Sequence, residues 1–250
     1  MKFSVAVPCI FRGVDFCEAI KSCASLGFDA AETYNWQNLD LQKVKSTLDD
    51  TGVTLISMCT TDFRMNEPEV RKVWLGGLRE SCEAARILGV KKLISQVGQD
   101  TGLERSYQHE AIVNTLREAR PILEEYGVTV MIEPLNLLVN HPGYYLPSSK
   151  EAFDIVNESE NPFAKVVYDI YHQQITEGNI IPTVKENLDF IAHLHAAAHP
   201  GRIDLWLGEN DYKFIFNAID SMGYEGYCGL EYRPTIDPKE SLLKIKELYG

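Results

Sequence analysis

Short apolar runs of about five residues alternate along the whole chain with amphipathic segments of roughly ten to twenty residues. This rhythm predicts strands and helices in strict alternation, and such an order requires parallel strands joined by crossover helices. The expected strands are Phe3–Val7, Ala30–Tyr34, Thr54–Met58, Lys92–Ser95, Thr129–Glu133, Lys165–Asp169, Ile191–His195 and Tyr227–Glu231.

A helix is expected after each strand. The expected helices are Val14–Leu26, Leu41–Thr51, Pro68–Leu88, Arg105–Tyr126, one starting after Ser148 or Ser149, one beginning near Asn179, Tyr212–Met222 and Pro238–Leu248. Glycines just after five of these helices suit a left-handed helix end: Gly27, Gly52, Gly89, Gly127 and Gly223. Eight strand–helix units close a barrel more naturally than they build an open sheet. No linker divides the chain, so the prediction is an α/β fold with a single (β/α)8 TIM barrel over residues 1–250.

Charge and cysteine usage restrict the partners and the compartment. The net charge of −12 disfavours binding to nucleic acid or to an anionic membrane, because such binding relies on Lys and Arg. The six cysteines form no CxxC pair, which argues against a disulfide framework and for a reducing cytosol. The N-terminal run is too short to be a signal peptide, and no apolar stretch reaches membrane-spanning length. We expect a cytoplasmic protein with a small-molecule substrate; homo-oligomerisation stays open.

Residues of metal-ligand type end four consecutive predicted strands: Glu133, Asp169, His195 and Glu231. In a barrel of this kind the active site lies at the carboxyl ends of the strands, so these side chains should meet. Three carboxylates and one imidazole form an oxygen-rich set suited to Mn²⁺, Mg²⁺ or Co²⁺. Singly, each is explained as well by a helix cap, an ion pair or a core position. Their shared register on successive strands favours one bound divalent metal ion.

Two further residues fall near this edge. His172 follows Asp169 by three positions, in the expected loop above the strand, and can hydrogen-bond a substrate hydroxyl. Arg202 falls in the long loop after the seventh strand, where a guanidinium can hold a carboxylate or a carbonyl oxygen. Both are explained equally simply as surface residues.

Three other residues are weaker candidates. Glu32 and Gln96 lie near the ends of the second and fourth strands. His193 precedes His195 by two positions, and side chains two apart on a strand share a face. His193 is therefore expected one layer deeper in the barrel, as a core or supporting residue and not as a ligand.

The segments EPLN…HPGYYLPSSKEAFDIV, YDIYHQQITEG, HLHAAAHPGR…LGENDY and GLEYRP resemble the hydroxypyruvate isomerase family. That family belongs to the xylose-isomerase-like barrels, which also include the ketose 3-epimerases. The resemblance is dense from Val128 to Pro234. It implies that the four strand-end residues bind the metal, that Glu133 and Glu231 form the acid–base pair, and that His172 and Arg202 bind substrate.

One residue departs from the family pattern. Hydroxypyruvate isomerases usually have Gln as the third ligand, where this chain has His195, as the ketose 3-epimerases do. The metal site is expected in either case, but the substrate is left open. Arg202 and the HPGR segment favour a short acid, whereas His195 favours a neutral ketose.

The implied reaction is proton transfer beside a carbonyl through a cis-enediolate. Delivery of the proton to the neighbouring carbon gives an aldose–ketose type isomerisation, and delivery to the opposite face of the same carbon gives epimerisation. We expect a metal-dependent isomerase acting on hydroxypyruvate, 2-oxo-tetronate or a similar 2-oxo acid. The alternatives are a ketose 3-epimerase, a dehydratase and a non-catalytic sugar-binding protein. An endonuclease IV type phosphodiesterase is disfavoured, because only six histidines and many acidic residues are present.

Overall fold

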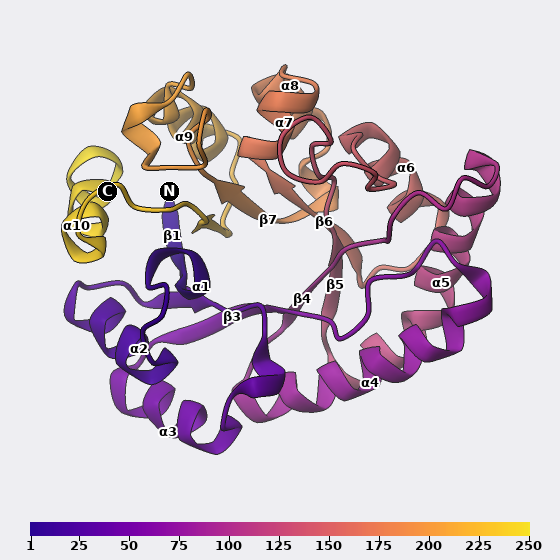
Figure 1. The fold of residues 1–250 in the computed structure, drawn as a ribbon, viewed down its shortest axis with the longest axis horizontal. Coiled ribbons are helices and arrows are strands. Elements are labelled where there is room, and N and C mark those ends of the chain that lie inside the picture. The colour runs from indigo at the N-terminus through magenta and orange to yellow at the C-terminus, as the bar shows by residue number, and fades with distance from the viewer.

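Eight parallel strands close into a barrel in chain order (Figure 1). The computed structural model describes residues 1–250. The strands are β1 (Lys2–Ala6), β2 (Ala30–Glu32), β3 (Thr54–Cys59), β4 (Lys92–Ser95), β5 (Thr129–Ile132), β6 (Ala164–Asp169), β7 (Ile191–Ala196) and β8 (Tyr227–Leu230). Closure comes from β8 pairing with β1, where Ser4 lies opposite Gly229. The predicted (β/α)8 TIM barrel is confirmed.

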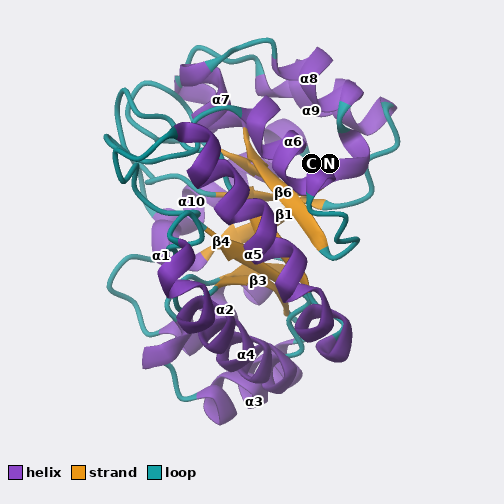
Figure 2. Ribbon diagram, turned by 90° about the vertical axis from the view of Figure 1, so that its right-hand side faces the viewer, coloured by secondary structure: helices purple, strands orange, loops and turns teal.

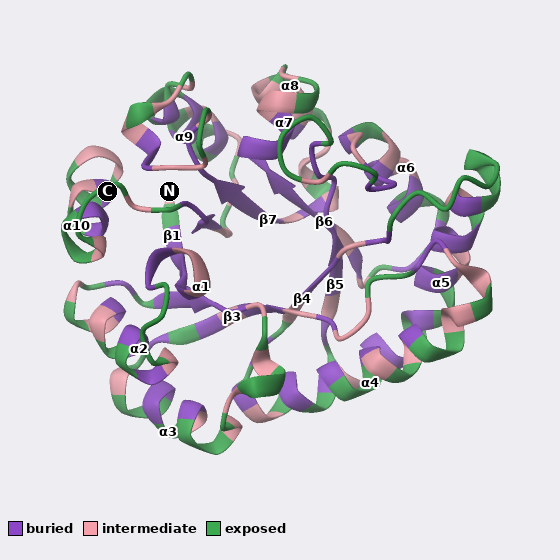
Figure 3. Cartoon of the chain, in the orientation of Figure 1, coloured by how far each residue is buried: buried purple, intermediate pink, exposed green.

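Helices surround the barrel, with their buried faces turned to the strands and their exposed faces outward (Figure 3). The α-helices are α1 (Val7–Ile10), α2 (Phe16–Ser25), α3 (Leu41–Thr51), α4 (Arg71–Leu88), α5 (Arg105–Tyr126), α6 (Ser149–Glu158), α7 (Ile170–Thr176), α8 (Ile180–Glu186), α9 (Tyr212–Ser221) and α10 (Pro238–Tyr249). Short 3-10 helices are η1 (Trp36–Asn38), η2 (Pro68–Val70), η3 (Leu188–Phe190) and η4 (Leu205–Leu207). None of these helices combines the length and the hydrophobicity that a membrane-spanning segment requires.

Local sequence signals set many of the helix ends. The five predicted capping glycines all have positive φ, and Gly52 ends α3 at 71°. Such a conformation suits glycine because it has no Cβ to collide with the preceding turn. At the other end of a helix, the Ser148 side chain accepts a hydrogen bond from the backbone N–H of Glu151 and begins α6.

Two short helices were not predicted. α1 begins at Val7, directly after β1, so the first strand ends one residue earlier than predicted. α7 occupies the segment expected to be a loop, and His172 therefore lies in a helix. The physical reason is the Asp169 carboxylate, which accepts a hydrogen bond from Tyr171 N at 2.8 Å and starts a helical turn where the strand ends.

The main hydrophobic core is a cluster of 63 buried residues that includes the inward faces of the helices. A separate apolar cluster is formed by Ile94, Met131 and Val167, on three neighbouring strands. Loops gather at one side of the molecule, beside the short helices α1 and α7 that follow β1 and β6 (Figure 2). This is the carboxyl end of the strands, where the predicted site residues lie.

Candidate metal centre

The four predicted ligands converge at the barrel mouth. Each of them offers one ligand atom within 4.8 Å of those of the others, and all four are buried: Glu133, Asp169, His195 and Glu231. Asp169 ends β6 directly beside His195 of β7, and Glu133 and Glu231 immediately follow β5 and β8. The strand register thus brings together residues up to almost one hundred positions apart. The arrangement has the donor types of a site for a divalent cation.

His195 lies between two sets of carboxylates. Its Nδ1 is 2.8 Å from Glu231 Oε2 and 3.7 Å from Glu133 Oε1. Its Nε2 is 3.0 Å from Glu32 Oε2 on the opposite side of the ring. Although Nδ1 and Glu231 Oε2 are at contact distance, the pair lacks hydrogen-bond geometry, and both atoms are buried without a hydrogen-bond partner. Without a metal ion the surrounding carboxylates hold the pKa of His195 well above its usual value despite burial, and a bound cation would replace the imidazole proton as the common partner of His195 Nδ1 and Glu231 Oε2.

The barrel mouth holds more acidic groups than cationic ones. Burial raises the pKa of Asp169 to about 7 and also raises the pKa of Glu133. Burial alone would raise the pKa of Glu231 too, but the adjacent Arg202 and His195 hold it below its usual value. Three buried carboxylates share these two cationic partners, so the mouth stays electrostatically suited to a further cation.

Arg202 reaches the site, as the sequence predicted. Its Nη2 lies 2.7 Å from Glu231 Oε2 and 3.2 Å from Asp169 Oδ2. The guanidinium also lies over the Tyr171 ring, 5.2 Å from the ring centroid. Its backbone φ of 53° belongs to the left-handed region, which non-glycine residues seldom adopt. The loop after β7 therefore holds this side chain over the predicted ligands.

His172 also lies beside the site, in α7. Burial lowers the pKa of His172 well below its usual value, so the imidazole is neutral near pH 7. Its Nδ1 accepts a hydrogen bond from Asn136 N at 3.2 Å and lies 2.6 Å from Asn136 Nδ2. A neutral ring that accepts at Nδ1 carries its proton at Nε2. That Nε2 is buried without a hydrogen-bond partner, 3.5 Å from Asp169 Oδ2, and is available as a donor.

Sequence reasoning did not single out Asn136, although it ends the EPLN segment that begins at Glu133. Its side-chain carbonyl accepts hydrogen bonds from the backbone N–H groups of Val139 and Asn140, which holds the loop after β5. The same side chain supports His172. The spacing of three residues from a strand-end glutamate was the available signal.

A cavity of about 270 Å³ adjoins the ligand cluster. Its lining residues are Tyr34, Asn35, Cys59, Phe63, Ile94, Gln96, Glu133, His195 and Glu231. Gln96, a weaker candidate from the sequence, therefore faces the cavity, whereas Tyr34 and Phe63 were missed. Two larger hollows, of about 490 and 510 Å³, are formed on the outer surface mainly by residues of the surrounding helices, away from the chemistry.

The two other candidates form a layer beneath the ligands. Glu32 is fully buried and accepts hydrogen bonds from His193 and His195. Burial opposes its ionisation, yet the two imidazoles hold the pKa of Glu32 well below its usual value. His193 is fully buried one layer below His195, where the alternation of strand side chains predicted it.

Comparison with known proteins places these features in a family. The family model described as "Xylose isomerase-like TIM barrel" matches residues 20–248. The hydroxypyruvate isomerase of Escherichia coli K12 is 28% identical over 251 residues, which covers 97% of each chain. The 2-oxo-tetronate isomerase of Cupriavidus necator is 26% identical over 258 residues, covering 100% of this chain and 99% of that protein.

Among solved structures, an AP endonuclease, family 2, from Brucella melitensis superposes with a TM-score of 0.94. It is 24% identical in sequence, and the match covers 100% of this chain and 99% of that one. At this identity the likeness concerns the fold, because one barrel fold hosts many chemistries.

Proposed function

This chain belongs to the xylose isomerase-like TIM barrel family, and we propose that it is a metal-dependent isomerase of a short 2-oxo acid such as hydroxypyruvate or 2-oxo-tetronate. The observation that carries the proposal is the convergence of three carboxylates and one imidazole on one point of the barrel mouth. The full-length similarity to a hydroxypyruvate isomerase and a 2-oxo-tetronate isomerase supports this substrate class.

The metal would be held by Glu133, Asp169, His195 and Glu231, and the oxygen-rich set favours Mn²⁺, Mg²⁺ or Co²⁺. A bound divalent ion supplies Lewis acidity, which makes the C–H beside a substrate carbonyl more acidic. The fit rests on His195 Nδ1 and Glu231 Oε2, which lie side by side in the mouth without a well-aligned hydrogen bond, although Arg202 Nη2 also lies 2.7 Å from Glu231 Oε2.

Proton transfer would be carried out by Glu133 and Glu231. They follow β5 and β8, which are not neighbours in the barrel, so a substrate between them meets a carboxylate on two sides. One glutamate removes the proton from the carbon that bears the hydroxyl, and a proton is returned to the former carbonyl carbon. The hydroxyl proton moves to the former carbonyl oxygen, which completes the isomerisation.

Arg202 and His172 would bind the substrate. The Arg202 guanidinium is the cation nearest to the predicted ligands and can pair with a substrate carboxylate. The Nε2–H of His172 can donate to a substrate oxygen. The cavity of about 270 Å³ gives room for a small-molecule substrate beside these two residues.

A ketose 3-epimerase is the second candidate, because His195 stands where the resemblance places an imidazole in epimerases and glutamine in hydroxypyruvate isomerases.

The substrate that the protein converts distinguishes the isomerase from the epimerase. Protein loaded with Mn²⁺ is incubated with hydroxypyruvate, 2-oxo-tetronate, tagatose or fructose, and the products are separated by chromatography. We expect isomerisation of an acid. An Arg202→Met variant should lose more kcat/KM toward the acid than toward any ketose. Epimerisation of a ketose with both acids unchanged would contradict the proposal.

A further inference from the structure

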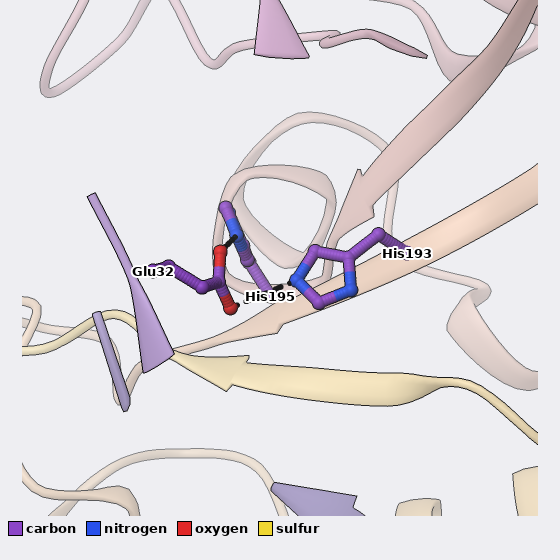
Figure 4. Close-up of side chains that lie close together, drawn as sticks. All are labelled: Glu32, His193 and His195. Atoms are coloured by element: carbon purple, nitrogen blue, oxygen red, sulfur yellow. Dashed lines mark hydrogen bonds and ion pairs between the residues drawn. The ribbon is translucent and has the colours of Figure 1, made fainter. Parts of the chain in front are cut away.

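A polar network lies inside the barrel directly beneath the metal centre, around Glu32 (Figure 4). Glu32 ends β2, is fully buried, and has four partners on three other strands. Oε1 accepts from Ser4 Oγ at 2.5 Å and lies 2.9 Å from His193 Nε2. Oε2 accepts from Ser57 Oγ at 2.6 Å and lies 3.0 Å from His195 Nε2. Each carboxylate oxygen thus has one hydroxyl and one imidazole partner.

The trio of Glu32, His193 and His195 has donor atoms close enough for a second metal ion, but its hydrogen bonds argue against one. Both carboxylate oxygens already accept from a serine hydroxyl. An ion there would have to displace two buried hydroxyl donors and leave them unpaired, which costs free energy. The trio is better explained as a support for the site above it.

Gly229 of β8 provides the space for the contact between Glu32 and His195. A Cβ atom at this position would lie 2.4 Å from Glu32 Oε1 and 2.5 Å from His195 Cδ2. Both distances are too short for real contacts. The strands place Gly229 opposite His195 on one side and opposite Ser4 on the other. The barrel wall is therefore shaped to let Glu32 and His195 meet.

We propose that Glu32 is a positioning residue that aligns His195 for metal binding. When His195 binds a metal ion its imidazole is neutral and has one N–H, which it would donate from Nε2 to the Glu32 carboxylate. The lone pair of Nδ1 is then directed at the mouth, where Nδ1 already faces Glu133 and Glu231. A carboxylate behind a metal-binding imidazole fixes the ring's tautomer and orientation and raises its basicity. This inference rests on the metal binding in the proposed function.

The test is the affinity of EDTA-treated protein for Mn²⁺, measured by isothermal titration calorimetry. Glu32→Gln keeps the size of the side chain but removes the charge, and we expect Mn²⁺ to bind about 10–100-fold more weakly. Ser4→Ala is the matched control, because it removes a donor from the oxygen that does not face His195. Its loss of affinity should be clearly smaller. The melting temperature of each metal-free variant is recorded in parallel.

The outcomes separate the two proposals. If wild-type protein binds no Mn²⁺, the proposed function fails and the positioning role falls with it. If wild type binds Mn²⁺ and Glu32→Gln binds it equally well, only the positioning role is overturned, even where the melting temperature of the variant drops. Two Mn²⁺ ions per wild-type chain would overturn the view that the Glu32 trio is a support.

A measurement on the wild type covers the case in which the variants do not fold. Protein labelled with ¹⁵N only in histidine and loaded with diamagnetic Zn²⁺ is studied by long-range ¹H–¹⁵N NMR. We expect His195 to carry its proton at Nε2 and to bind the ion through Nδ1. Coordination through Nε2, with the proton at Nδ1, would overturn the inference.

Discussion

Replacing Asp169 by asparagine tests two effects of this carboxylate separately: how much it destabilises the metal-free protein, and how much it contributes to metal binding. Asp169 is fully buried, and one of its oxygens accepts the hydrogen bond from Tyr171 N that starts α7. An asparagine carbonyl can accept the same bond, so the helix start is preserved. What Asp169→Asn removes is the ionisable oxygen that lies 3.2 Å from Arg202 Nη2 and next to the other predicted ligands.

The magnitude follows from the pKa of Asp169, which burial raises from 3.8 to about 7. Because the folded pKa is above the unfolded one, this group's contribution to stability is complete below pH 3.8 and is lost as the pH rises through 7. Each pH unit within that window costs about 1.4 kcal/mol. From pH 5 to pH 8 the wild type should therefore lose up to about 3 kcal/mol relative to the variant.

Urea unfolding of both proteins in EDTA, at pH 5 and at pH 8, measures this difference. We expect the stability difference in favour of the variant to grow by up to about 3 kcal/mol between pH 5 and pH 8. With saturating Mn²⁺ at pH 8 the order should reverse, because only the wild type gains binding free energy. Identical pH dependence of the two metal-free proteins would refute the assignment of a raised pKa to this carboxyl.

Two further substitutions test the surroundings of the site. Gly229→Ala should lower the free energy of unfolding by about 1–3 kcal/mol, because its Cβ meets Glu32 and His195, and urea denaturation measures the loss. Asn136→Asp places a carboxylate oxygen where Nδ2 now lies 2.6 Å from His172 Nδ1, which draws the imidazole proton to Nδ1. The donor at Nε2 is then lost, and kcat/KM should fall by about tenfold or more; an unchanged value would exclude substrate binding by His172.

The sequence predicted the part of the site that lies on the strands. Strand side chains alternate in direction, and parallel strands in a barrel share one carboxyl edge, so Asp169 and His195 could be placed beside each other from their positions alone. The same rule placed His193 one layer below. These predictions needed only the strand boundaries to within about two residues.

What the sequence left open depends on contacts between distant segments. The helix that carries His172 begins where the Asp169 carboxylate caps it. The hydrophobic pattern of this segment did not distinguish a short helix from a loop. Glu32 was recognised only as a weak candidate, because its importance comes from Ser4 and Ser57 on neighbouring strands. The lining of the cavity by Tyr34 depends likewise on how the loops fold over the barrel mouth.

Deuterium uptake from solvent tests the central claim most directly. Protein loaded with Mg²⁺ is incubated in D2O with hydroxypyruvate, and proton NMR follows the signal of the carbon next to the carbonyl. Glu133→Gln and Glu231→Gln serve as controls, because each removes one member of the predicted acid–base pair. We predict metal-dependent loss of that signal in the wild type and little or none in either variant. No exchange in a wild type that demonstrably binds the metal, or undiminished exchange in both variants, would contradict the account.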